Sequence, residues 1–565
     1  MNRQFFLSAG HSRWSPRFSV SDGGNSLKAG LQLFAICMCL VAFHVTPLAA
    51  QGIFGGSRNP QATNWGDWTK FPVREMSKTA DIPDRPEKLS FPPLKYEPPA
   101  PEKFRVQLKA GPVAYIVPDR ERPLVNIMVY VRVGEYLEPA GKQGLAELTG
   151  WLLTHGGAGT NSAGQLEERV AFLGAQLNSS IGENQGSVNL NLLSKDLNEG
   201  LGILRDVLFL PHFEDDKITL RKQQILQGMQ QRNDDSSGIE DREAGFLAFG
   251  ENFWANRYST SNSIASITHR DIKKFQYKWF WPSNFVVAVS GDFDRDEMIS
   301  KLEKCFAGQP QGTLEMNGGD IYPTGTPPPI PTNTVFAAPG VYLVNKPDVN
   351  QGRVSIMLPG IRRDNPDYYA VIMMNDILGG GGFTSHIMSR VRSDEGLAYD
   401  AHSIFPGGVY YPLTFEAGFQ SKSRTVAYAA TLVREEIEKM VAQPVKAEEL
   451  SEAKRAFIDS FPRTFATKDQ TAAVLAREEF TGRYARDPKF FAELRSRINA
   501  VTTNDVQRVA KKYLKPDQLV ILVVGNKDEI LLGHPNHPEK LTDLGGGKST
   551  ELPLRDPMTM QPMAK

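Results

Sequence analysis

The sequence predicts an α+β protein made of two similar domains, each a mostly antiparallel sheet packed against helices. The main observation is an internal repeat: residues 267–291 recur as residues 501–525, and Asp271 and Gly291 match Asp505 and Gly525 at one offset of 234 residues. Short repeats are typical of solenoids, whereas a unit this long indicates two folded domains. Strand-like and helix-like runs are also segregated within each unit, which favours α+β.

The first unit is predicted to span residues 101–309. Alternating apolar residues around a Gly-Pro turn predict two strands within 104–117. Further strands are expected at 124–133, within 175–193 and at 286–290, and helical periodicity predicts helices at 143–154, 162–173, 196–208, 215–233 and 294–306.

The second unit, residues 336–530, repeats this order after a Pro-rich linker of residues 310–335, in which the stretch 326–331 favours an extended polyproline conformation. Strands are predicted at 341–345, 352–358 and within 397–419, helices at 365–378, 384–394, 424–442, 447–460 and 468–481, and a last helix and strand within 503–524. The polar tail, residues 531–565, is expected to be flexible and without regular structure.

Composition limits the classes of function. The 565 residues include 64 Lys+Arg and 64 Asp+Glu, so the formal net charge is zero, and no long basic run is present. This excludes nucleic acid as a partner. Cys37 and Cys39 lie in an N-terminal apolar run, which leaves Cys305 alone in the body. A single thiol supports neither a disulfide framework nor a cysteine-based zinc site.

Residues 1–50 have the layout of a secretory signal, with a basic leader, an apolar run and small residues at its end. The alternative is an uncleaved membrane anchor, because the apolar run approaches the length needed to span a bilayer. Both interpretations place the body outside the cytoplasm, either in a bacterial periplasm or anchored facing it. Residues 51–100, rich in Pro, Gly and polar residues, are predicted to be an extended leader.

Five short segments carry a resemblance to a known family: residues 131–135, 138–139, 144–146, 380–385 and 392–399. In this order and spacing they resemble the insulinase/pitrilysin family of zinc peptidases, which includes mitochondrial processing peptidase. The resemblance covers nearly all of residues 100–530. It implies the mitochondrial processing peptidase-like metallohydrolase fold in both units.

Active members of that family carry His-x-x-Glu-His on one helix, in which the two His bind zinc and the Glu activates water, and a Glu from a later helix is the third ligand. The matching positions here hold Glu147, Gly150 and Trp151, and Gly228 stands at the third ligand. We therefore expect a degenerate zinc site and no metal bound by this chain. A recruited role for Glu147 or Glu183 stays open.

The remaining histidines form no metal-binding pattern. His155 is expected at a helix end, and His534 and His537 lie in the tail without further ligands. His386 and His402 could approach one another in the second unit, but nothing marks them as ligands.

Arg392 and Tyr399 match a pair that, in the family, reaches from the second domain to the zinc site and hydrogen-bonds the substrate backbone or the oxyanion. Gly396 is a plausible helix C-cap that would let both side chains converge. The alternative is a surface arginine paired with Asp394 or Glu395, with a half-buried tyrosine.

Gly379, Gly380, Gly381 and Gly382 form neither a Walker loop nor a dinucleotide fingerprint. They are interpreted as a flexible entry to the helix that carries Arg392. The resemblance implies a second possibility, that this run contacts substrate as the glycine-rich loop of non-catalytic family subunits does.

These observations predict a zinc-less subunit of a heterodimeric metallopeptidase. Its partner would be a homologue that carries His-x-x-Glu-His and holds the zinc, and peptides would be the substrates. The membrane becomes a partner only if the N-terminal segment is uncleaved. The alternative is a structural or peptide-binding scaffold, similar to the core subunits of respiratory complexes. In neither case is the chain expected to be a peptidase by itself.

Overall fold

Two six-stranded sheets organise the part of the chain that the computed structural model describes, residues 88–89, 96–309, 313–317, 320–325 and 327–563. The first sheet has the strand order β1 (Arg105–Gln107), β2 (Val113–Pro118), β6 (Phe285–Gly291), β3 (Leu124–Val131), β5 (Gly186–Leu193), β4 (Gln176–Ile181). The second has the order β12 (Ala398–Ile404), β14 (Thr414–Lys422), β10 (Gln351–Pro359), β15 (Val520–Gly525), β9 (Gly340–Asn345), β16 (Ser549–Leu552).

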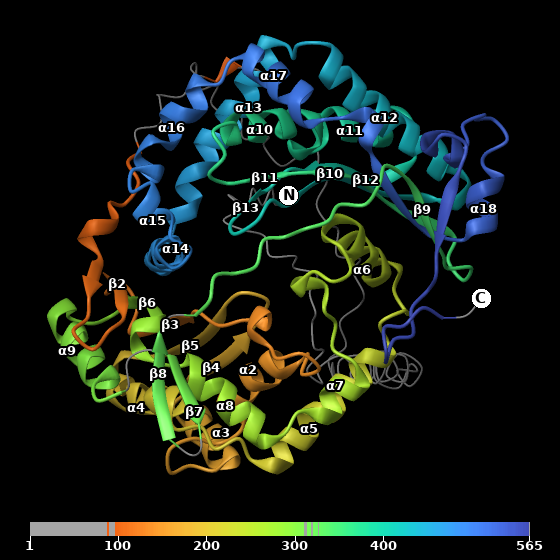
Figure 1. Cartoon of the computed structure of the whole chain (residues 1–565). Helices are drawn as coiled ribbons and strands as arrows, with labels where there is room; N and C mark the ends of the chain where they lie inside the picture. Colours follow the sequence, from red (N-terminus) through yellow and green to blue (C-terminus); the bar gives the residue numbers. More distant parts are fainter. Residues whose placement is uncertain (1–87, 90–95, 310–312, 318–319, 326, 564–565) are drawn as a thin grey trace, which may run out of the picture. The chain divides into compact units, whose positions relative to one another are not determined.

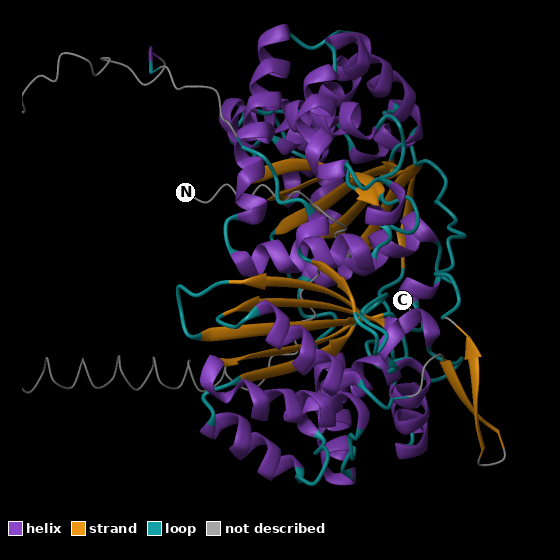
Figure 2. Ribbon diagram, turned by 90° about the vertical axis from the view of Figure 1, so that its left-hand side faces the viewer, coloured by secondary structure: helices purple, strands orange, loops and turns teal. Residues whose placement is uncertain are grey.

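Most neighbouring strands are antiparallel, and the parallel pairs are β2–β6 in the first sheet and β15–β9 and β9–β16 in the second. Helices pack against both sheets (Figure 1, Figure 2). The α+β fold with duplicated domains is therefore confirmed.

The helices of each half, in chain order, are as follows. Those of the first half are α2 (Leu145–His155), α3 (Ala163–Phe172), α4 (Leu197–Phe209), α5 (Asp215–Gln230), α6 (Ser236–Phe249), α7 (Ser261–Ser266), α8 (His269–Trp279) and α9 (Arg295–Phe306). Those of the second half are α10 (Tyr368–Asn375), α11 (His386–Met388), α12 (Val426–Ala442), α13 (Ala447–Ser460), α14 (Lys468–Phe480), α15 (Arg483–Arg486), α16 (Phe490–Ala500), α17 (Thr503–Tyr513) and α18 (Lys527–Leu532).

The internal repeat corresponds to α8–β6 in the first half and α17–β15 in the second. Each helix begins with a capping box: the Thr268 hydroxyl accepts from the Asp271 N–H at 3.2 Å, and the Thr502 hydroxyl accepts from the Asp505 N–H at 3.1 Å. Each helix leads through a turn into a central strand. Residues of β6 and β15 are buried almost throughout, which explains their uninterrupted apolar runs.

Each half contributes a helix to the sheet of the other half. Helix α14 packs on β2 and β6, where the Phe480 ring lies 6.0 Å from that of Tyr130. Helix α6 packs on β10 and β15, and the Phe249 ring lies 5.6 Å from that of Tyr411. The sequence predicted α14 but not α6. Apolar and charged residues are buried together on α6, so it lacks the one-sided periodicity on which the prediction depends.

The expectation that residues 531–565 lack regular structure is wrong. The tail contains the end of α18 and the edge strand β16, which pairs in parallel with β9. Further on, Arg555 donates to Glu251 at 2.6 Å. The side chains of β16 are exposed or half-buried, and its pairing uses backbone groups, so it leaves no hydrophobic pattern in the sequence.

The linker includes regular structure that the sequence did not predict. It contains a hairpin of β7 (Thr313–Asn317) and β8 (Asp320–Gly325). The Pro-rich part after the hairpin has no regular secondary structure, and Pro331 accepts a hydrogen bond from the Trp254 indole at 2.9 Å.

The predicted N-terminal signal or anchor and most of the predicted leader lie outside the described residues. Among the described residues, no helix combines the length and the apolar character that a membrane crossing requires.

A buried carboxyl group fixes the start of α2. Glu138 is 7% exposed, and its Oε1 accepts from the N–H groups of Gly144 at 3.0 Å and Ala146 at 2.8 Å. These bonds satisfy two of the N–H groups that a helix leaves unpaired at its N-terminus. Burial, with a smaller contribution from Glu135, raises the pKa of Glu138 to about 8.

We expect Glu138 to make folding stability depend on pH. Because its folded-state pKa lies above the ordinary value of 4.5, its contribution is fully present below that value and is lost as pH rises towards about 8. Glu138→Gln keeps an oxygen acceptor but cannot ionise. Urea unfolding should show that the free energy of unfolding of the variant, relative to the unchanged protein, rises by a few kcal/mol between pH 5 and pH 8. If the free energy of unfolding changed with pH equally in both proteins, this role of Glu138 would be contradicted.

Candidate functional site

The degenerate zinc frame lies on two packed helices. Glu147, Gly150 and Trp151 are on α2, and Gly228 is near the end of α5. The half-exposed Glu147 carboxylate is the only metal-ligand type among these four residues. Among the described residues, no group of three or more His, Cys, Asp or Glu side chains is placed to hold a metal ion.

A guanidinium group that the sequence did not predict occupies this region. Arg221 of α5 is 7% exposed and donates to Glu147 Oε1 at 3.0 Å and to Gln224 Oε1 at 3.2 Å. Its guanidinium lies 5.4 Å from the centroid of the Trp151 ring, a cation–π contact. Arg221 precedes Gly228 by seven residues, two helical turns on the same face, and that spacing was the available signal.

His155 completes this group of side chains. Its ring stacks on Trp151 with centroids 4.2 Å apart, and its Nδ1 lies 2.9 Å from the Trp151 carbonyl oxygen. Burial lowers the pKa of His155. The prediction that His155 ends its helix is confirmed.

Gly150 is required by the close approach of α2 to β4. A Cβ at this position would lie 2.3 Å from the Ile181 nitrogen, and the Ser179 hydroxyl donates to the Gly150 carbonyl at 2.6 Å. The Glu that serves as base in active relatives therefore has no room here. A Cβ at Gly228 would meet no atom within 4 Å. With Arg221 beside Glu147 and no space at position 150, the residues present do not fit a catalytic zinc ion.

The second half brings Arg392 and Tyr399 together, as predicted. The Arg392 guanidinium lies 4.6 Å from the Tyr399 ring centroid and 4.5 Å from that of Phe383, so it is held between two aromatic faces. Tyr399 is 85% exposed and Phe383 is 56% exposed. The described residues give Arg392 no hydrogen-bond acceptor. Glu395, its predicted alternative partner, instead accepts from Arg390 at 2.9 Å.

The backbone around Arg392 explains this convergence. Residues 389–394 form a π-helical turn, a feature frequent at functional sites. Gly396 has φ +64°, and the Leu397 N–H donates to the Val391 carbonyl at 2.9 Å, which closes the helix as predicted. Beside this turn, the hydrogen bond from His402 lowers the pKa of Asp400, and Arg392 adds to this effect.

Part of the glycine run is π-helical and packs closely on Ser403, so its interpretation as a flexible entry to the next helix is wrong. Residues 376–380 are π-helical, and a Cβ on Gly379 would lie 2.5 Å from the Ser403 nitrogen. Asn375 and Ser403 hydrogen-bond each other across this contact at 2.8 and 3.1 Å. Gly382 has φ +76°, which favours glycine. The run therefore fixes the position of Phe383.

The other histidines singled out in the sequence contact different side chains and do not form a common site. His386 Nε2 lies 3.1 Å from Glu449 Oε1, and His402 Nδ1 lies 2.7 Å from Asp400 Oδ2. His537 stacks on Tyr428 at 3.8 Å, and the His534 and His537 rings are 4.9 Å apart.

The two glycines of the zinc frame should respond differently to substitution. Gly150→Ala is expected to lower the free energy of unfolding by about 1–3 kcal/mol, because its Cβ collides with the backbone of β4. Gly228→Ala, the matched control in open space, should leave stability unchanged or raise it by up to about 1 kcal/mol. Urea denaturation measures both. Equal effects would contradict the close approach of α2 to β4.

Comparisons with known proteins agree with this geometry. Residues 115–242 match the insulinase family (peptidase family M16), and residues 266–457 match the peptidase M16 inactive domain. The chain is 23% identical over 396 residues to an uncharacterized zinc protease of Streptomyces coelicolor, covering 68% of this chain and 82% of that protein. It is 24% identical over 412 residues to a non-peptidase homolog of Helicobacter pylori, covering 72% and 90%.

A solved structure shares the fold. The peptidase M16 inactive domain from Pseudomonas fluorescens superposes with a TM-score of 0.64 at 24% identity, covering 75% of this chain and 97% of that one. The two family matches together span more than half of the sequence. The chain therefore belongs to peptidase family M16, the insulinase family.

Proposed function

We propose that this chain is the zinc-less subunit of a two-chain metallopeptidase. Its partner would be a homologue with His-x-x-Glu-His that holds the zinc, and peptides would be the substrates. The observation that carries this proposal is the half-buried Arg392, whose guanidinium contacts the exposed rings of Phe383 and Tyr399. A guanidinium presents several N–H donors in a fixed fork, which suits a peptide carbonyl or an oxyanion.

The chemistry assigned to each side chain follows from its groups. Zinc in the partner would activate the attacking water. Arg392 would donate to the oxygen on which negative charge develops, and the Tyr399 hydroxyl would donate beside it. Phe383 and Tyr399 restrict the rotation of the guanidinium, so less side-chain entropy is lost on binding. The secretory signal or anchor predicted at residues 1–50 would place this complex outside the cytoplasm.

A scaffold without peptidase activity is the second candidate. It is favoured by the zinc frame, where Arg221 and Glu147 form an internal ion pair at 3.0 Å. It is also favoured by Arg392 itself, whose two stacking partners come from its own chain. Under this proposal the chain would bind peptides or other subunits without cutting them.

Affinity purification from native cells, with mass spectrometry and zinc analysis of what co-elutes, separates the two candidates. A stoichiometric homologue with His-x-x-Glu-His and one zinc per pair of chains supports the split-site peptidase. A zinc-free homodimer or a large assembly that does not cleave peptides supports the scaffold.

In the co-purified complex, Arg392→Ala should lower kcat on a quenched fluorescent peptide by about 100-fold or more, the effect of removing one oxyanion donor. Arg392→Lys should recover only part of this loss, because lysine keeps the charge without the fork. Assembly, followed by light scattering, should not change. Arg434→Ala is the control, because Arg434 is only half-buried and pairs with Glu438 on the same helix. Normal kcat in Arg392→Ala would remove Arg392 from the mechanism.

A further inference from the structure

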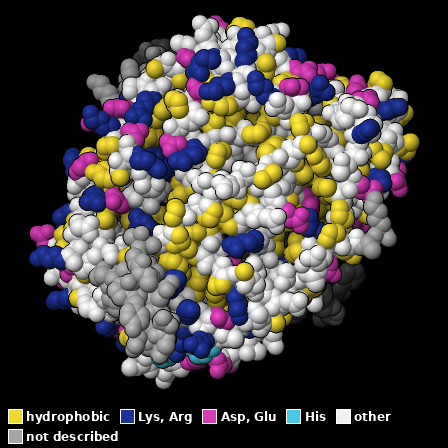
Figure 3. Space-filling view, viewed as in Figure 1, with side chains coloured by type: hydrophobic (Ala, Val, Ile, Leu, Met, Phe, Trp, Pro, Cys, Tyr) yellow, Lys and Arg dark blue, Asp and Glu magenta, His cyan; other side chains and the backbone are white. Residues whose placement is uncertain are grey.

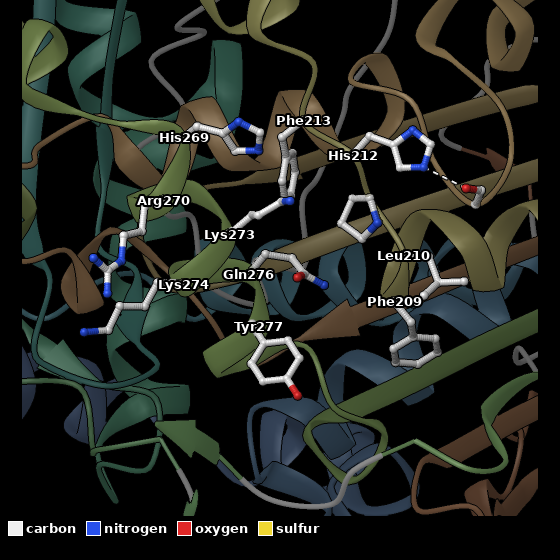
Figure 4. Close-up of a pocket in the computed structure, with 12 residues that line it drawn as sticks. Phe209, Leu210, His212, Phe213, His269, Arg270, Lys273, Lys274, Gln276 and Tyr277 are labelled. Atoms are coloured by element: carbon white, nitrogen blue, oxygen red, sulfur yellow. Dashed lines mark hydrogen bonds between the residues drawn. The ribbon is translucent and has the colours of Figure 1, made fainter. Parts of the chain in front are cut away.

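A pocket of about 750 Å³ lies in the first half between α8 and the segment of residues 209–213. Figure 4 shows α8 side chains on one side and those of the segment on the other. This volume is within the usual range of small-molecule sites, about 300–1,000 Å³. None of the residues assigned to the degenerate zinc frame or the Arg392–Tyr399 pair lines it.

One side of the pocket is cationic. Arg270, Lys273 and Lys274 lie on one face of α8 and are exposed. Among the side chains that the structure describes, no Asp or Glu lines the pocket and none forms an ion pair with these three cations. The carboxylates beside this face have other partners: Asp215 lies 3.0 Å from His269 Nδ1, and Asp271 accepts from Lys142 at 2.9 Å. The net charge of the chain is zero, and basic and acidic side chains are interspersed over the face shown in Figure 3. The positive charge of Arg270, Lys273 and Lys274 is therefore a local feature of the pocket.

The opposite side is apolar and firmly held. Leu210 is 49% exposed, and the Phe209 ring packs 6.0 Å from that of Phe285. His212 Nε2 lies 2.7 Å from the Gly159 carbonyl oxygen, and Phe213 adopts φ +61°, which is unusual for a bulky residue. Residues held in such conformations cluster at ligand sites.

The internal repeat provides a comparison within the same chain. Helix α17 corresponds to α8 at the offset of 234 residues, so Arg270, Lys273 and Lys274 correspond to Asn504, Gln507 and Arg508. Arg508 donates to Asp367 at 2.7 Å and is thereby neutralised. Both helices lead into the central strand of their sheet, and α17 does so without an unpaired cationic face. The unpaired cations of α8 are therefore not required for this structural role.

We propose that this pocket binds an amphiphilic anion, with a free long-chain carboxylate as the ligand class. The carboxylate would accept from Lys273, Lys274 and Arg270, and the chain would cover Leu210 and the neighbouring apolar residues. Charge-assisted hydrogen bonds fix the head, and burial of apolar surface supplies most of the affinity. This inference is independent of the proposed peptidase role.

The test uses the purified full chain and a dansyl-labelled undecanoate as fluorescent probe. Dodecanoate, kept below its micellar concentration, should displace the probe, whereas dodecyltrimethylammonium of equal chain length should not. Lys273→Glu with Lys274→Glu should weaken probe binding about tenfold or more. Lys273→Arg with Lys274→Arg should keep it within a few-fold.

The matched control is Lys304→Glu with Lys511→Glu. It makes the same change in net charge at exposed positions outside the pocket, one of them on the repeated helix α17. This control should bind the probe as the unchanged protein does. Displacement by the ammonium detergent, undiminished binding in Lys273→Glu with Lys274→Glu, or an equal loss in the control would overturn the proposal.

Discussion

A buried contact between the halves holds this structure together: one apolar face of each sheet is covered by a helix from the other half, while the opposite face packs on helices of its own half. Helix α14 lies on β2 and β6, and α6 lies on β10 and β15. Polar groups fix both contacts. Glu479 accepts from Arg105 and from the Tyr115 hydroxyl at 2.9–3.0 Å, and Glu240 accepts from Arg353 and Ser355 at 2.6–2.8 Å. Separating the halves would expose both apolar faces and leave these charges unpaired.

Packing within the first half explains why its residues do not fit a catalytic zinc ion. The approach of α2 to β4 removes the space for a base at Gly150. Arg221, held by Glu147 and Trp151, joins α5 to α2 where active relatives use a metal ion. A guanidinium supplies positive charge and directional hydrogen bonds, but it neither lowers the pKa of a bound water nor offers an open coordination position. Arg221 therefore links the two helices without supplying the chemistry of a zinc ion.

The two halves have therefore diverged in different ways from a common unit. In the second half, a wound glycine run, a π-helical turn and the Gly396 cap hold an arginine between two exposed aromatic rings. In the first half, α8 carries a cationic face beside an apolar segment, whereas its counterpart α17 has its arginine neutralised by Asp367. Duplication supplied the scaffold, and a few side chains on equivalent helices gave each half its own surface chemistry.

The sequence by itself determined the duplicated α+β fold, the repeated helix and strand of residues 267–291 and 501–525, the residues that replace His-x-x-Glu-His and the convergence of Arg392 with Tyr399. All of these depend on residues close in sequence or on the register of the repeat. Tertiary structure alone decided the rest: Arg221 beside Glu147, the collision that excludes a side chain at Gly150, helix α6 and the edge strand β16. These features depend on contacts between distant segments or on backbone pairing, and neither leaves a periodic pattern in the amino-acid sequence.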